Sequence, residues 1–160
     1  MNWNTVHEFR DWWLKAGRPL RPPFEQPIFI TDLVHSLCLY REGKFQVELY
    51  IIGPNKTSPS HAHPGVDSSF IFLAGDLEFG DKTGSFIDLS DKQKPQPNGA
   101  HMLLGQTIDA LDGEMHSVRA FQNGGAFLSF EYWKDKEPDS VVLNWVGAPD
   151  GAIHAKILDK

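Results

Sequence analysis

Short segments of β-type residues, separated by glycine, proline and aspartate, are the feature that most limits how this chain can fold. In residues 45–52, apolar side chains at the odd-numbered positions alternate with more polar ones at positions 46, 48 and 50, as on a strand with two different faces. The expected strands are residues 28–31, 36–41, 45–52, 69–73, 77–79, 85–89, 101–104, 107–108, 116–121, 126–133 and 141–145. No helical pattern recurs between them, which argues against a parallel α/β sheet. The sequence therefore predicts an all-β sandwich or barrel.

The N-terminal segment follows the pattern of a helix. Thr5 and Glu8 have the spacing of a capping box, in which each side chain satisfies a backbone N–H at the helix start. Apolar residues recur at helical spacing from there to Gly17, which is a stop signal. Residues 18–27 contain four prolines and are expected to form an extended arm. We therefore divide the chain into a helix and arm, residues 1–27, with the helix packed as a lid on a β-domain of residues 28–160.

Composition excludes several classes of partner. The chain has 160 residues, which suits one domain with a sizeable core, and a net charge of -6 without any run of lysine or arginine. Nucleic acid or an anionic membrane would need a basic patch, so neither is expected as a partner. No apolar stretch has the length of a signal peptide or a membrane span. Cys38 is the only cysteine, so intramolecular disulfides are impossible, and we expect a reducing, cytoplasmic setting.

A pair of histidines carries the strongest chemical signal. His61 and His63 are two residues apart, so on an extended chain both imidazoles point to the same face. Neutral imidazole is a good ligand for zinc, copper, iron and nickel, although a pair needs further ligands from elsewhere in the fold. The alternative is that both histidines lie in a polar loop and bind nothing.

The surroundings of this pair resemble the first motif of the cupin superfamily. That motif reads His-x-His, a short spacer, glutamate, and then glycine. His61, His63 and Gly75 fit it, and Ser68 stands where the glutamate would fall.

The second cupin motif reads Pro-x-Gly-x-x-His, followed by asparagine. Gly113 and His116 fit it, whereas Leu111 replaces the proline and Ala120 the asparagine. The resemblance implies a double-stranded β-helix, or jelly roll. It further implies a divalent transition metal (iron, manganese, nickel or zinc) held by three histidines, His116 being the third, in the mouth of the barrel.

The departure at Ser68 leaves two arrangements open. If the strand keeps the family register, Ser68 faces inward and the site has histidine ligands only. If a bulge shifts the register, Asp67 faces inward and supplies a carboxylate, although it could equally be a turn residue. We favour the first arrangement, because the spacing to Gly75 already fits without a bulge.

The resemblance implies a metal-dependent enzyme that acts on a small molecule. A dioxygenase-like oxidoreductase is the candidate, because thiol dioxygenases also use three histidines and no glutamate. Asp67 and Tyr132 are then candidate catalytic residues, as acid–base or substrate-orienting groups. Glu48 and Tyr50 are candidate substrate contacts. The alternative is a non-catalytic ligand-binding or structural jelly roll that has lost its metal.

Some remaining residues have simpler interpretations. Cys38 is expected to be a small core residue, and His7 and His35 are expected on the surface. His101 could line the mouth or face solvent, and His154 has no predictable partner. A homodimer is expected, because the resemblance implies pairing through an arm such as residues 18–27. Tryptophans that look exposed in the sequence would also suit an interface: Trp3, Trp133 and Trp145.

Overall fold

The computed structural model describes residues 2–22, 28–31, 34–80, 100–101, 105, 107–114 and 116–138, and for residues 28–31, 34, 57–61 and 100–101 it describes the backbone only. The predicted strands at 85–89 and 141–145, and most of the one at 101–104, lie outside the described residues. So do Trp145 and His154.

Helix α1 (Val6–Lys15) begins and ends where its sequence signals predicted. The Thr5 hydroxyl accepts a hydrogen bond from the Glu8 N–H at 3.1 Å. The Glu8 carboxylate reaches back one residue further than in a standard capping box, to the N–H of Asn4 at 2.8 Å. Beyond the helix, Gly17 adopts a φ of 84°, a left-handed conformation that stops the helix and that glycine adopts without steric cost.

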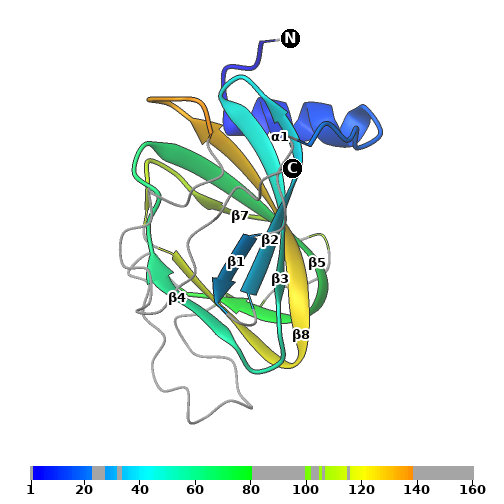
Figure 1. Ribbon diagram of the computed structural model, residues 1–160, viewed down its shortest axis with the longest axis vertical. Coiled ribbons are helices and arrows are strands. Elements are labelled where there is room, and N and C mark those ends of the chain that lie inside the picture. Colours follow the sequence, from blue (N-terminus) through cyan, green and yellow to red (C-terminus); the bar gives the residue numbers. More distant parts are fainter. Residues whose placement is uncertain are drawn as a thin grey trace.

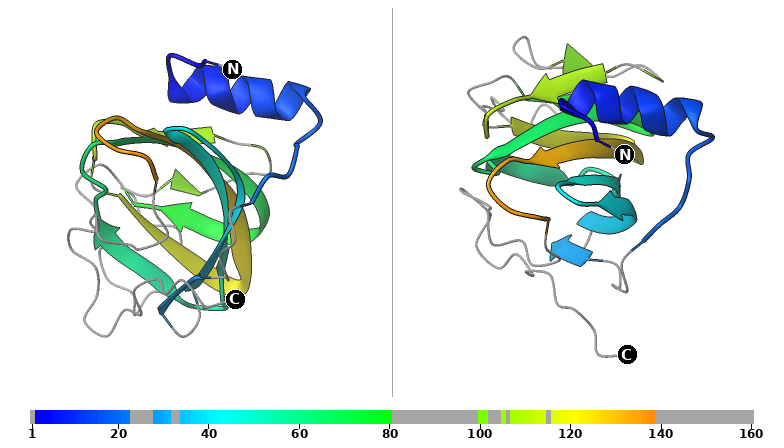
Figure 2. Two further views of the ribbon diagram at one scale, coloured as in Figure 1. Left: turned by 45° about the horizontal axis from the view of Figure 1, so that its top comes forward. Right: turned by 90° about the horizontal axis from the view of Figure 1, so that it is seen from above.

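The β-strands form one antiparallel sheet that curls round an interior (Figures 1 and 2). They are β1 (Ile28–Thr31), β2 (Val34–Glu42), β3 (Phe45–Ile52), β4 (Thr57–His61), β5 (Val66–Phe79), β6 (Ala100–His101), β7 (Thr107–Ala110) and β8 (His116–Trp133). The order is β1-β2-β3-β8-β5-β6, with β4 paired to β8 and β7 to β5. The predicted all-β architecture is confirmed.

Two long strands replace four predicted short ones. Segments 69–73 and 77–79 belong to β5, and segments 116–121 and 126–133 belong to β8. The glycines between them bend the strands instead of ending them: Gly75 has a φ of 85°, and a side chain there would collide with the backbone of Gly124 and Gly125 on the paired strand. Register shifts flank Gly75 on both sides, as expected of bulges at a bend.

A second difference concerns residues 57–61, which none of the predicted strands covers. They form β4, which pairs with the first half of β8. The alternation that identifies a strand from sequence is missing in this polar segment, so only its partner strand makes it extended.

Both faces of the central strands are covered. The interior holds one apolar cluster, which we call the interior cluster: Ile52, Phe70, Phe72, Leu77, Phe79, Ala110, Val118, Ala120 and Phe127. A second apolar cluster, which we call the helix-side cluster, lies between α1 and the outer face of β2, β3 and β8: Val6, Phe9, Trp13, Tyr40, Phe45, Val47, Leu128 and Phe130. Figure 2 shows α1 lying across the outside of the barrel. The helix therefore packs on an outer wall, as the predicted lid.

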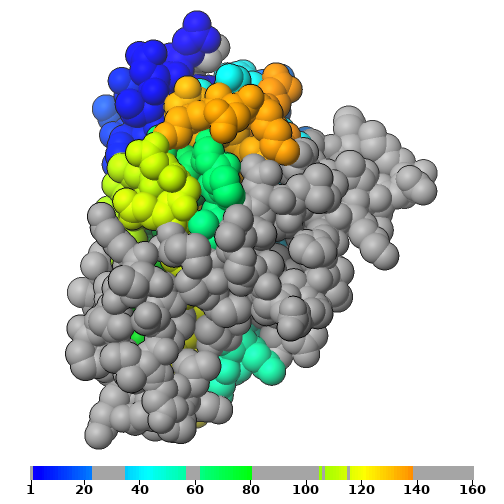
Figure 3. Space-filling view, turned by 90° about the vertical axis from the view of Figure 1, so that its left-hand side faces the viewer, coloured from blue at the N-terminus to red at the C-terminus, as the bar shows by residue number. Residues whose placement is uncertain are grey.

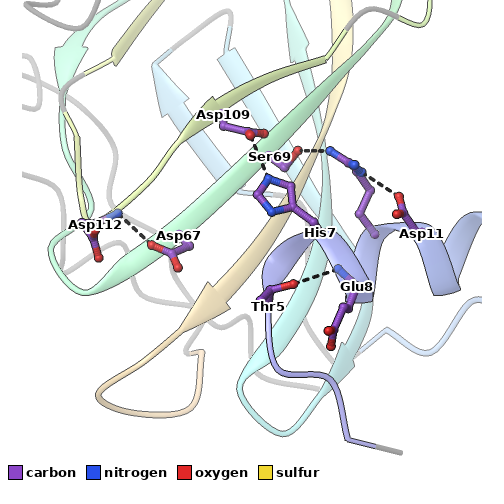
Figure 4. A network of polar contacts seen from close by, with 9 residues as sticks. Thr5, His7, Glu8, Asp11, Asp67, Ser69, Asp109 and Asp112 are labelled. Carbon is purple, nitrogen blue, oxygen red and sulfur yellow. Dashed lines mark hydrogen bonds and ion pairs between the residues drawn. The ribbon is translucent and has the colours of Figure 1, made fainter.

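Polar contacts hold α1 in register with the sheet (Figure 4). His7 Nε2 lies 2.7 Å from the Asp109 carboxylate on β7, and Arg10 donates to the Ser69 hydroxyl on β5 at 2.8 Å. Trp13 donates its indole N–H to the carbonyl of Pro19 at 2.9 Å, which fixes the start of the arm. Arg21 then bridges to β2 through backbone hydrogen bonds with Leu39 and Arg41.

Candidate functional site

A tight turn leads from His63 into β5. The N–H of Val66 donates to the His63 carbonyl at 3.1 Å, and Gly65 between them has a φ of 76°. Pro64 and Gly65 are the residues that such a turn favours at its two central positions. The turn therefore fixes the backbone of His63 relative to the first residue of β5.

The turn before β8 packs against this first turn. Gly113 has a φ of 72°, and its N–H donates to the Val66 carbonyl at 3.1 Å. A Cβ at Gly113 would lie 3.0 Å from the His63 carbonyl oxygen and 3.1 Å from the Cα of Pro64. Glycine at position 113 therefore allows the backbone before His116 to approach the backbone of His63.

His116 is the first residue of β8, and its ring is buried between His63 and the interior cluster. Its centroid lies 5.2 Å from that of His63, with a 32° tilt, and 5.3 Å from that of Phe70. Nδ1 lies 3.1 Å from the Glu114 carbonyl oxygen, which can only accept, so Nδ1 carries the proton and the lone pair is on Nε2. Burial lowers the pKa of His116 and so favours the neutral, metal-binding form.

The separation of the His63 and His116 imidazoles suits two ligands of one metal ion. With metal–nitrogen distances of about 2.1 Å and ligand angles of roughly 90–110°, two bound imidazoles have centroids roughly 4.6–5.3 Å apart. The separation of His63 and His116 lies in that range. His61 pairs with His116 across β4 and β8, although its side chain lies outside the described set. Among the described side chains, no three histidine, cysteine, aspartate or glutamate residues group as metal ligands.

Asp67 and Tyr132 do not join the histidines. The Asp67 carboxylate accepts from the N–H of Asp112 at 2.7 Å (Figure 4). It also lies 3.1 Å from Lys134 Nζ. Tyr132, its partner on β8, stacks on Phe45 at 4.5 Å in the helix-side region. Figure 3 shows α1 (blue), the turn around residue 112 (yellow-green) and the segment after β8 (orange) close together in the upper part of the view.

Ser68 has the opposite orientation. It is 3% exposed and lies two residues before Phe70, a member of the interior cluster that contacts His116. Successive side chains of a strand alternate between faces, so Ser68 shares the face of Phe70, and Asp67 does not. Backbone pairing places Ser68 opposite Glu131 of β8 without an intervening bulge.

Behind Phe70, the interior wall is polar. Gln46 and Glu48 of β3 pair with Glu131 and Ser129 of β8, and all four side chains are buried. The Gln46 Nε2 lies 2.5 Å from a Glu48 oxygen and 2.6 Å from a Glu131 oxygen. Ser129 pairs with Phe70 in turn, so this polar wall is contiguous with the residues that surround His116.

Further donors surround the two carboxylates. Glu131 accepts from the Trp133 indole at 2.9 Å and from the Ser129 hydroxyl at 3.1 Å. Glu48 is hydrogen-bonded to Tyr50 and Ser36. Burial and then the neighbouring Glu131 raise the pKa of Glu48 to about 8, and burial raises the pKa of Glu131.

Glu131, Gln46, Ser129 and Trp133 were not identified from the sequence as site residues. The available signal was the alternation in 126–133, where Ser129, Glu131 and Trp133 occupy one face and Phe130 and Tyr132 the other. The predicted site residue Tyr132 lies on the face that packs toward α1, opposite to the face of Glu131. The expectation that Trp133 is exposed is wrong, since its side chain is only 7% exposed.

Cys38 and His7 lie where the sequence placed them. Cys38 is buried and pairs with Glu48 across β2 and β3, and His7 is partly exposed on α1. Trp3, which was expected to be exposed, is instead half-buried against Phe9 and Phe45. The side chain of His101 lies outside the described set. Helix α1 has 10 residues and is too short to span a bilayer. The described part of the chain contains no other helix that is long and apolar enough to do so.

Comparison with known proteins identifies the fold. No protein-family model and no curated protein sequence matches the chain. Among solved structures, KdgF from Halomonas sp. matches with a TM-score of 0.55 and 10% identity over 72% of this chain and 92% of that one.

Two further matches have the same character. An RmlC-like cupin from Shewanella frigidimarina has a TM-score of 0.54 and 10% identity, covering 69% of this chain and 86% of its own. An uncharacterised protein with a double-stranded β-helix domain from Klebsiella pneumoniae has a TM-score of 0.50 and 15% identity, covering 98% of each chain. Together with the all-β topology, these likenesses show that the chain has a double-stranded β-helix, or jelly-roll, fold like that of cupin structures.

Proposed function

We propose that this chain is a metal-dependent enzyme of cupin fold that acts on a small molecule, with His61, His63 and His116 as ligands of a divalent transition metal. The observation that carries the proposal is the approach of the His63 and His116 imidazoles to a 5.2 Å centroid separation. His116 is held in the tautomer that directs its Nε2 lone pair away from the Glu114 carbonyl.

Three imidazole ligands leave coordination positions for water, oxygen or substrate. Bound iron(II) would supply oxygen chemistry, whereas zinc, manganese or nickel would polarise a carbonyl or lower the pKa of water. We favour a dioxygenase-like oxidoreductase, because the neutral side chain of Ser68 lies on the inner face of β5, at the position where the cupin motif has its glutamate ligand. In this proposal Phe70 limits the space beside the metal, and Asp67 and Tyr132 take no part in the chemistry.

Metal analysis tests the first half of the proposal. Purified protein, loaded separately with iron, manganese, nickel and zinc and then desalted, should retain close to one ion per chain. Alanine substitution of His61, His63 or His116 should each lower the retained metal, whereas His7→Ala should not, because His7 lies on α1 against Asp109. A wild-type protein that retains none of these metals rejects the proposed site.

Oxygen consumption tests the second half. With iron(II) bound, the enzyme should consume oxygen in the presence of at least one member of a panel of thiols, diketones and sugars, and His116→Ala should not. A protein that binds metal and is stabilised by a panel member, yet transforms none, would instead be the ligand-binding jelly roll of the alternative interpretation.

A further inference from the structure

The bridge between Glu48 and Glu131 is an arrangement that the proposed metal chemistry does not use. The Gln46 Nε2 contacts both carboxylates, at 2.5 Å and 2.6 Å. The Arg41 Nε donates to the Gln46 Oε1 at 3.1 Å. A guanidinium can only donate, so Oε1 must face Arg41 and the amide NH₂ must face the two carboxylates.

Among the side chains that the structure describes, the charge balance at this bridge is unfavourable if both carboxylates are ionised. Strand β2 contributes Arg41, with one positive charge, and the Cys38 thiol, which donates toward Gln46. Strand β3 contributes the Tyr50 hydroxyl, whose pKa burial raises well above its usual value. The neighbours on β8 are neutral, Ser129 and Trp133, and Ser68 of β5 is neutral as well.

Two ionised carboxylates would therefore place two negative charges, joined by one amide, against the single charge of Arg41. Glu48 and Glu131 are only 8% and 7% exposed, so water screens them little. Retaining one proton on the pair leaves one negative charge, which Arg41 matches. The directions of the two pKa shifts agree, since burial raises both and Glu131 raises that of Glu48 further.

We propose that Glu48 and Glu131 form a proton-sharing acid pair, bridged by Gln46, that makes the stability of the pairing between β3 and β8 depend on pH. The pair holds one proton at neutral pH. Loss of that proton at alkaline pH puts like charges on adjacent strands and loosens their pairing. This inference goes beyond the proposed function and does not depend on a bound metal.

The sign of the pH dependence follows from linkage. An acid whose pKa is raised by folding contributes most to stability below its unfolded pKa, about 4.3 for glutamate. That contribution is lost as pH rises through the interval up to the folded pKa, which for Glu48 is about 8. The folded protein should therefore become less stable as the pH rises through this interval.

Carboxyl ¹³C NMR of wild-type protein tests the pair directly. At least one of the two resonances should titrate two or more pH units above the usual value of about 4.3, and each should sense the titration of the other. If both carboxyls titrate independently near that usual value, the proposal is wrong. This measurement needs no variant, so it decides the question even where a substitution impairs folding.

Variants test the consequence for stability. Glu48→Gln and Glu131→Gln should each make the thermal midpoint less dependent on pH between 5 and 9 than in the wild type. Glu137→Gln changes an exposed carboxylate just beyond β8 and should leave the wild-type dependence intact. Folded Glu48→Gln and Glu131→Gln variants that both keep the full wild-type dependence would overturn the proposed role in stability.

Discussion

Replacing Gly113 with alanine should separate the two histidine-bearing segments without removing any proposed ligand. Gly113 has a φ of 72°, and an added Cβ would meet the His63 carbonyl oxygen at 3.0 Å and the Pro64 Cα at 3.1 Å. Both neighbours are backbone atoms, so neither can rotate away. The substitution must move one turn relative to the other, and His63 moves with it.

A matched control isolates this crowding from backbone strain. Gly105 has a similar φ of 78°, but a Cβ there would meet nothing within 4 Å. Alanine in the left-handed region costs roughly 1–2 kcal/mol, partly offset by a less flexible unfolded chain, so Gly105→Ala should lose about 1 kcal/mol of unfolding free energy. Crowding adds about 1–3 kcal/mol, so Gly113→Ala should lose about 2–4 kcal/mol.

Thermal unfolding and metal titration of the same samples provide the assay. For a chain of this length, each kcal/mol corresponds to about 2–4 °C in thermal midpoint, so the two variants should be clearly resolved. Gly113→Ala should weaken metal binding by roughly 10–100-fold, as expected when a support of a ligand is disturbed. Equal stability and equal metal affinity in Gly113→Ala and Gly105→Ala would refute the packing argument.

Four further outcomes are expected. Phe9→Ala should lower the unfolding free energy by about 3–5 kcal/mol in urea titrations, because Phe9 of α1 is fully buried against the sheet; a loss below about 1 kcal/mol would mean that α1 adds little to the stability of the domain. Asp67→Asn should leave metal affinity unchanged while slightly lowering the thermal midpoint; a large loss of metal would contradict the orientation of Ser68. Metal-free protein should lose stability as pH falls below about 6.5, because a lowered folded pKa of His116 disfavours protonation, and His116→Gln should reduce this loss in pH-dependent unfolding. Light scattering should give a dimer, since Leu37 and Ile51 expose apolar surface on β2 and β3, and a monomer mass would contradict it.

The sequence determined the local elements wherever one local signal dominated. The alternation in 45–52 predicted β3 with its observed bounds, and Thr5 with Gly17 marked the limits of α1. The histidine pair indicated a candidate site. The spacing from that pair to Gly75 indicated that Ser68, which shares the face of Phe70, is the inward-facing residue at the start of β5. These features depend on side chains a few residues apart, whose relative positions the backbone geometry of one element sets.

The tertiary structure decided what depends on a partner strand. Gly75 reads as a break in the sequence, yet it is a bend, because Gly124 and Gly125 on β8 let the two backbones approach each other. The alternation in β8 distinguishes the face of Glu131 from that of Tyr132 without showing which is interior. Helix α1 buries the outer face, so hydrophobicity marks both faces as core. The approach of His116 to His63, and the sharing of Gln46 by two carboxylates, join residues distant in sequence, which only the register of the closed sheet brings into contact.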